Sequence, residues 1–171
     1  MIYIYNDYGG THSTALAAAY HLNKLPAGRM LVKEQILNAH TFNKLKTSDM
    51  GKLIYHGQDE RGDVVYTVGC GASKVVAKSM RHISELLLDR YHAHERIIFS
   101  NTSPTVPIAM TFGGLFSRRL KIDFIGVPLL VKGAQQSCDN IARLVEHTKK
   151  MARSASERIV VLDNKAYKDN K

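Results

Sequence analysis

Residues 2–22 read Ile-Tyr-Ile-Tyr-Asn-Asp-Tyr-Gly-Gly-Thr-His-Ser-Thr-Ala-Leu-Ala-Ala-Ala-Tyr-His-Leu, and this stretch decides the fold. The apolar start predicts a short buried strand at 2–5. The alanine-rich run predicts a helix that ends near Asn23, with Thr11 or Ser13 as its cap. Between them, paired glycines allow a sharp turn and a close approach to a ligand. Free N–H groups at the helix start, backed by the helix dipole, favour an anion. The stretch therefore predicts a phosphate-binding loop at residues 9–14.

The rest of the chain alternates between strand and helix patterns. Two β-rich runs flank a polar turn and predict a hairpin, at 52–56 and 63–69. Helical spacing predicts helices over 33–46, from Ser73 to about 91, over 105–118 and over 137–153. Apolar runs predict further strands at 96–100, 122–126 and 157–162. This alternation is typical of a mainly parallel sheet covered on both faces, since parallel strands need crossover connections.

The predicted fold class is therefore α/β, a three-layer α/β/α sandwich with a mainly parallel sheet of P-loop-like or Rossmann-like type. The chain has no internal repeat and no clear linker, so we expect one domain over residues 1–171 with a polar tail from about 164. In such a sheet, ligands bind beyond the carboxyl ends of the strands. Unusual sequences follow three predicted strands, at 6–14, 69–73 and 100–105, and we expect these loops to meet on one rim.

Composition narrows the class of protein. The chain is 44% hydrophobic and 23% charged, which fits an ordinary globular domain rather than a disordered one. It has no apolar run of the roughly 20 residues that span a bilayer and no signal-peptide pattern, so we expect a cytoplasmic protein without membrane contact. Two cysteines, Cys70 and Cys138, are too few for a disulfide framework or a structural zinc site and predict free thiols and no metal centre.

Positive charge is concentrated toward the C-terminus. The formal net charge is +9, and residues 118–171 contribute twelve basic and six acidic side chains to it. A basic segment of this kind attracts phosphates, nucleic acid or an acidic protein. A solvated surface of helix and tail explains the same pattern without a partner. A non-catalytic module that binds nucleic acid or an acidic protein through this basic C-terminal third is one alternative function.

The first loop resembles the P-loop of nucleoside-triphosphate-binding proteins, in the form Gly-Gly-x-Gly-Lys-Ser/Thr followed by alanines. The resemblance implies a nucleotide with Mg²⁺ as the bound group, with Ser13 in the magnesium-binding hydroxyl position. One glycine of the pattern is absent, and His12 stands where the lysine belongs. Asn6 and Asp7 are expected to orient a ligand or metal at the rim. A turn that only lets the helix pack on the strand is the alternative. The candidate ligand-binding residues are Gly9, Gly10, Thr11, His12, Ser13 and Thr14.

Cys70 offers a second chemistry. It lies between Gly69 and Gly71 at a predicted strand-to-helix junction, where a helix N-terminus lowers the pKa of a thiol. The alternative enzyme would use Cys70 as nucleophile and His12 as base, provided that the two loops are neighbours. Phosphatase-type chemistry needs an arginine six residues after the cysteine, and Val76 is there instead. A small buried thiol explains Cys70 without catalysis.

The opening Tyr-Gly-Gly-Thr-His-Ser at 8–13, the Val-Tyr-Thr-Val-Gly at 65–69 and the pattern over most of the chain resemble an uncharacterised bacterial family of about this size. That family is a domain of unknown function found mainly in spore-forming lineages. The resemblance implies a bacterial, cytosolic protein. It brings no activity, cofactor or catalytic residue to transfer to this chain.

Overall fold

The computed structural model describes residues 1–73 and 75–168, and in these residues it contains one sheet of five strands: β1 (Ile2–Asp7), β2 (Ile54–Gln58), β3 (Val64–Gly69), β4 (Ile97–Asn101) and β5 (Ile159–Leu162). Their spatial order is β2-β3-β1-β4-β5. Strand β1 lies in the middle and pairs in parallel with β3 and β4, and β4 pairs in parallel with β5. Only the edge strand β2 is antiparallel, as the second half of the predicted hairpin with β3.

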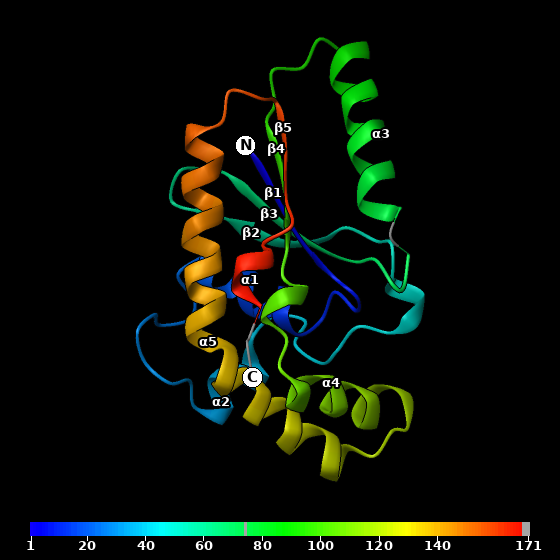
Figure 1. Cartoon of the computed structure of the whole chain (residues 1–171), viewed down its shortest axis with the longest axis vertical. Helices are drawn as coiled ribbons and strands as arrows, with labels where there is room; N and C mark the ends of the chain where they lie inside the picture. Colours follow the sequence, from blue (N-terminus) through cyan, green and yellow to red (C-terminus); the bar gives the residue numbers. More distant parts are fainter. Residues whose placement is uncertain (74, 169–171) are drawn as a thin grey trace.

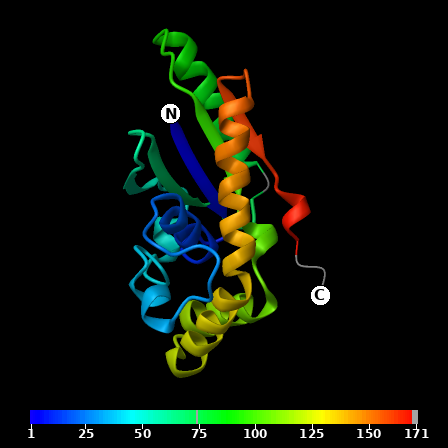
Figure 2. The same ribbon diagram turned by 90° about the vertical axis from the view of Figure 1, so that its left-hand side faces the viewer.

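Helices cover both faces of this sheet. The main helices are α1 (Ser13–His21), α2 (Lys33–Asn38), α3 (Val76–Arg90), α4 (Ile108–Gly114) and α5 (Asp123–Ser154). Figure 1 shows α5 on one side of the sheet and α3 on the other, and Figure 2 shows α5 running along the length of the molecule. The predicted α/β class with a mainly parallel sheet is confirmed. Short 3-10 turns complete the chain at Thr47–Asp49, Ser103–Thr105 and Lys165–Tyr167.

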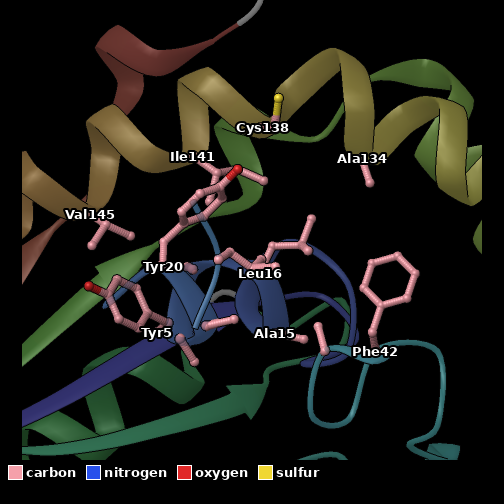
Figure 3. Packing of buried hydrophobic residues seen from close by; sticks show 14 of the residues in the cluster. Tyr5, Ala15, Leu16, Tyr20, Phe42, Ala134, Cys138, Ile141 and Val145 are labelled. Carbon is pink, nitrogen blue, oxygen red and sulfur yellow. The ribbon is translucent and has the colours of Figure 1, made fainter. Parts of the chain in front are cut away.

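Helix α1 lies in the core between β1 and α5. All nine of its residues are buried, because the alanine side chains let the helix approach its neighbours closely. Figure 3 shows Leu16 and Tyr20 of α1 beneath Ile141 and Val145 of α5, with Tyr5 of β1 beside them. The residues that follow β1 are therefore held between the central strand and the largest hydrophobic cluster of the protein.

The strand predicted at 122–126 is wrong, because these residues begin α5. The β-branched and aromatic side chains favour a strand locally, but tertiary packing decides the conformation. A Cβ atom on Gly126 would lie 2.5 Å from the Ser117 nitrogen, and one on Gly133 would lie 2.6 Å from the Met110 nitrogen. These two glycines allow α4 and the π-helical turn Leu115–Arg119 to pack directly on the α5 backbone.

Three further differences concern element lengths and ends. The helix predicted over 33–46 is confined to α2, because the chain turns at Thr41 and Asn43, which have positive φ angles of 67° and 55°. The helix predicted over 105–118 is α4 followed by the π-helical turn. The polar tail contains the turn Lys165–Tyr167, and residues 169–171 lie outside the described residues. Within the described part of the chain, no helix has the length and apolar character of a membrane span.

Candidate functional site

The loop between β1 and α1 is clamped against the end of β3. Gly10 has a φ of +69°, and a Cβ atom there would lie 2.5 Å from the Gly69 nitrogen. A Cβ atom on Gly69 would in turn lie 2.7 Å from the carbonyl carbon of Gly9. Such a contact requires glycine on both sides. The paired glycines of the sequence therefore serve a close approach between two backbone segments.

The three loops that were expected to share one rim do meet there. The Cys70 N–H donates to the Asp7 carbonyl oxygen at 2.8 Å, and the Thr102 N–H donates to the Asn6 carbonyl oxygen at 2.8 Å. The loops after β3 and β4 thus flank the end of β1 on its two sides. After β1 the chain forms β2 and β3 on one side of this central strand, and it then crosses to form β4 on the other side. A sheet with this change of direction commonly has its ligand site at that point.

The carboxylate of Asp7 is the centre of this loop. Its Oδ1 accepts the Gly10 N–H, and its Oδ2 accepts the Ser13 hydroxyl at 2.7 Å. The Ser13 oxygen also lies 2.8 Å from the Thr102 hydroxyl oxygen. Burial raises the pKa of Asp7, and hydrogen bonds from Ser13 and from backbone groups of the loop oppose that rise. The sequence predicted free N–H groups for an anion in this stretch, but the Gly10 N–H is not free, because it is already paired with the Asp7 carboxylate.

The candidate ligand-binding residues lie together but are mostly covered. Ser13 and Thr14 are fully buried, and Thr11 is 2% exposed. Neither Thr11 nor Ser13 caps α1, because His12 occupies the N-cap position. The Thr11 hydroxyl donates to the Thr41 carbonyl oxygen at 2.6 Å and so fixes the loop to the turn after α2. Gly9 and His12 are only partly buried and form the accessible edge of the loop.

His12 has partners that do not include Cys70. Its Nε2 lies 3.2 Å from Asn43 Oδ1, and its ring packs edge-on against Phe42 with centroids 5.3 Å apart. Burial lowers the pKa of His12 to about 4, and the positive charge of Arg118 acts in the same direction. His12 is therefore neutral at pH 7 and donates through Nε2. It does not supply the permanent charge of the P-loop lysine.

Cys70 has the electrostatic environment of an unreactive thiol. Burial and the neighbouring Asp7 carboxylate raise the pKa of the thiol, which disfavours the thiolate. Neither the hydrogen bonds nor the ring contacts between described residues join Cys70 to His12. The structure thus places the two candidates of the alternative enzyme in neighbouring loops without bringing the thiol and the imidazole together. Both cysteines are free thiols, as predicted.

A chain of hydrogen bonds, which the sequence did not reveal, connects His12 to the start of α5. Asn43 Nδ2 donates to the Ser117 hydroxyl at 2.8 Å, and that hydroxyl donates to Asp123. Ser117 lies in the π-helical turn, and such turns often occur at functional sites. Asn43 holds its position through a left-handed backbone conformation. The sequence contains no indication that Asn43, Ser117 or Asp123 belong to the site. For Thr102 it does, because this residue lies in the loop at 100–105 that follows a predicted strand.

Six charged residues of the C-terminal third lie on the C-terminal half of α5 and line one groove. This groove, of about 1280 Å³, runs along that half of the helix. The charged residues that line the groove are Asp139, Arg143, Glu146, Lys149, Lys150 and Arg153. Part of this charge is already engaged, since the Lys149 ammonium donates to the His21 carbonyl oxygen at 3.0 Å. The groove therefore keeps a moderate excess of positive charge.

The fold and the loop define a class: an α/β protein with a glycine-rich loop at the end of its central parallel strand. Within that class, the chain belongs to the family described as protein of unknown function (DUF3189), whose model matches residues 2–150. The resemblance found in the sequence to a domain of unknown function is thereby confirmed. Comparison with curated proteins and with solved structures found no match.

Proposed function

We propose that this chain binds a phosphorylated small molecule, with a nucleotide as the leading candidate, at the loop of residues 9–14. The observation that carries the proposal is the arrangement of donors around Asp7. The Gly10 N–H and the Ser13 hydroxyl together hold a carboxylate at the end of the central strand. A phosphate offers acceptor oxygens of the same kind, and the N-terminus of a helix favours its charge. The loop thus has the donors of an oxyanion site, with its own carboxylate in the anion position.

Binding at this site requires the Asp7 charge to be neutralised or moved. Mg²⁺ is suited to that role, because the Asp7 carboxylate and the Ser13 and Thr102 hydroxyls form a set of hard oxygen ligands. When bound, Mg²⁺ supplies the positive charge that His12 does not. Our proposal is therefore a Mg²⁺-dependent site for a phosphorylated ligand. We also propose that the protein is bacterial and acts in the cytoplasm, where phosphorylated small molecules are abundant.

The experiment is an isothermal titration of the full chain with ATP, GTP and inorganic phosphate, each with and without Mg²⁺. We expect the wild-type chain to bind at least one of these ligands only when Mg²⁺ is present. Asp7→Asn keeps an acceptor for the Gly10 N–H but removes the charge. This variant is expected to bind the anion without Mg²⁺ and to lose the Mg²⁺ dependence.

Asp89→Asn provides the matched control, since Asp89 is an exposed carboxylate that pairs with Arg158 far from the loop in sequence. It should behave like the wild-type chain. If neither the wild-type chain nor Asp7→Asn binds any of the three ligands, the phosphate site is refuted. If binding is unaffected by Asp7→Asn in the presence and absence of Mg²⁺, the role of the carboxylate is refuted.

A second candidate function rests on the groove beside α5. We propose that a nucleic acid or an acidic protein binds there, because Arg143, Lys150 and Arg153 line one continuous groove. The test is fluorescence anisotropy with a labelled DNA duplex at about 50 and about 200 mM salt, together with the double variant Arg143→Glu/Lys150→Glu. A phosphate-backbone partner predicts weaker binding at the higher salt and loss in the double variant. Binding that is insensitive to both excludes the nucleic acid.

A further inference from the structure

A β-bulge turns His56 into the interior of the protein. In the hairpin, Tyr55 pairs with Tyr66 and Gly57 pairs with Val65, so His56 is the extra residue of β2. Bulges of this kind re-aim a side chain and recur beside functional sites. The His56 side chain is 7% exposed, and its Nε2 lies 3.0 Å from the Thr67 hydroxyl oxygen. One ring nitrogen is thus fixed by the sheet, and the other, Nδ1, faces away from it.

The Nδ1 atom of His56 faces a second histidine. His40 follows α2, and its Nδ1 lies 3.4 Å from His56 Nδ1, with the two rings nearly perpendicular at 85°. His56 is buried and His40 is exposed, so one side of the pair is accessible to solvent. Both rings border a cavity of about 380 Å³. The polar residues that line this cavity beside them are Lys24, Glu34, Gln35 and Asn38.

The spacing of the two nitrogens fits a shared metal ion. An ion with tetrahedral coordination holds histidine nitrogens at about 2.0–2.1 Å, and two such nitrogens then lie about 3.3–3.4 Å apart. We infer that His40 and His56 form a binding site for a divalent cation of the zinc class, separate from the Asp7 loop. Imidazole nitrogens select Zn²⁺, Cu²⁺ or Ni²⁺ over Mg²⁺ or Ca²⁺, which take oxygen ligands. A direct hydrogen bond between the two rings is the alternative explanation of the 3.4 Å distance between the two Nδ1 atoms.

The surroundings of the pair support a cation with open coordination positions. The Thr67 hydroxyl orients the His56 ring, as the outer partners of metal-binding histidines do. Glu34 and Asn38 line the same cavity but are not placed to complete the coordination. In the described residues no group of three or more His, Cys, Asp and Glu side chains is placed to hold a metal. The remaining positions are therefore left to water or to a ligand in the cavity. The positive charge of Lys24, which also lines the cavity, opposes the binding of a cation. Its ammonium donates to the His56 carbonyl oxygen at 3.1 Å.

The test is an isothermal titration of the full chain, without a histidine tag, with ZnCl₂. We expect one equivalent of Zn²⁺ to bind to the wild-type chain and at least tenfold weaker binding in His40→Ala. His40 is exposed, so this variant should keep the thermal stability of the wild-type chain. Thr67→Val keeps the shape of the buried side chain and removes the partner of His56, and should weaken binding roughly tenfold.

His94→Ala is the control, because the exposed sequence His92-Ala-His94 offers the other closely spaced histidine pair. It should bind Zn²⁺ like the wild-type chain. No binding of Zn²⁺ to the wild-type chain, full binding in His40→Ala, or loss of binding in His94→Ala would each overturn the inference. None of these variants alters the Asp7 loop, so the result is independent of the phosphate titrations.

Discussion

The substitution Gly10→Ala tests whether the β1–α1 loop is clamped as the structure shows. Two effects act at this position. The backbone has a φ of +69°, a conformation that L side chains rarely adopt, and the new Cβ atom would lie 2.5 Å from the Gly69 nitrogen. The Gly10 N–H also donates to the Asp7 carboxylate, so the loop has little freedom to relax. Both effects therefore destabilise the native state.

The two effects can be given magnitudes. Placing a residue with a Cβ atom in the left-handed region costs roughly 1–2 kcal/mol. Forcing extra atoms into a filled contact costs about 1–3 kcal/mol. We expect Gly10→Ala to lower the free energy of unfolding by roughly 2–5 kcal/mol, the sum of these ranges. For a chain of this size each kcal/mol corresponds to about 2–4 °C in the thermal midpoint.

Two other glycines separate the contributions. Gly28 has a φ of +74° with nothing within 4 Å of its Cβ position, so Gly28→Ala carries the conformational effect alone. Gly69→Ala carries the steric effect, with the Gly9 carbonyl carbon at 2.7 Å and no positive φ. Urea denaturation at equilibrium gives the free energy of unfolding for the three variants and the wild-type chain. The clamp is refuted if Gly10→Ala is no more destabilising than Gly28→Ala.

Three further predictions concern the buried pair of His21 and Tyr5 and the packing of α4 on α5. Burial and the charge of Lys149 lower the pKa of His21 to about 4. The unfolded ring has a pKa near 6.5, so the unfolded state takes up the proton first, and stability is lost as the pH falls from about 6.5 to about 4. Urea denaturation across this range should show that His21→Gln removes up to about 3 kcal/mol of that loss, and an unchanged pH profile would contradict a neutral His21. The Tyr5 hydroxyl lies 2.8 Å from His21 Nδ1 in the core. Tyr5→Phe leaves that nitrogen without its partner and should lower the free energy of unfolding by about 1–2 kcal/mol, whereas an effect below about 0.5 kcal/mol would show that the bond contributes little. Gly133→Ala should destabilise the chain by about 1–3 kcal/mol, because its Cβ atom would lie 2.6 Å from the Met110 nitrogen. Alanine is the better helix former by about 1 kcal/mol, so a gain in thermal stability would show that α4 and α5 are packed less closely than described.

Local patterns predicted the fold where sequence and packing agree. The strand, glycine pair and helix of residues 2–22, the hairpin and the C-terminal half of α5 all follow from periodicity and turn residues. The pattern failed at 122–126, where packing of Gly126 against Ser117 imposes a helix on residues that favour a strand. The early end of α2 at Asn38 likewise depends on the left-handed turns that follow it, which no periodicity reveals.

The sequence predicted that three loops would meet, but not how their side chains are arranged. Glycines and strand ends indicated where three loops would meet, since that depends only on topology. That the Asp7 carboxylate turns back onto the Gly10 N–H depends on side-chain geometry, and a sequence does not contain it. The link from His12 through Asn43 to Ser117 joins residues 31 and 74 positions apart, so no local spacing could predict it.

The two thiols differ in a way that makes one of them a natural position for a reporter group. Cys138 in α5 is 3% exposed, whereas Cys70 is only partly covered, and the Cys70 N–H donates to the Asp7 carbonyl oxygen. A maleimide dye should therefore attach to Cys70 alone, slowly at neutral pH because the pKa of that thiol is raised. Its fluorescence would then follow movement of the β1–α1 loop in the unmutated chain.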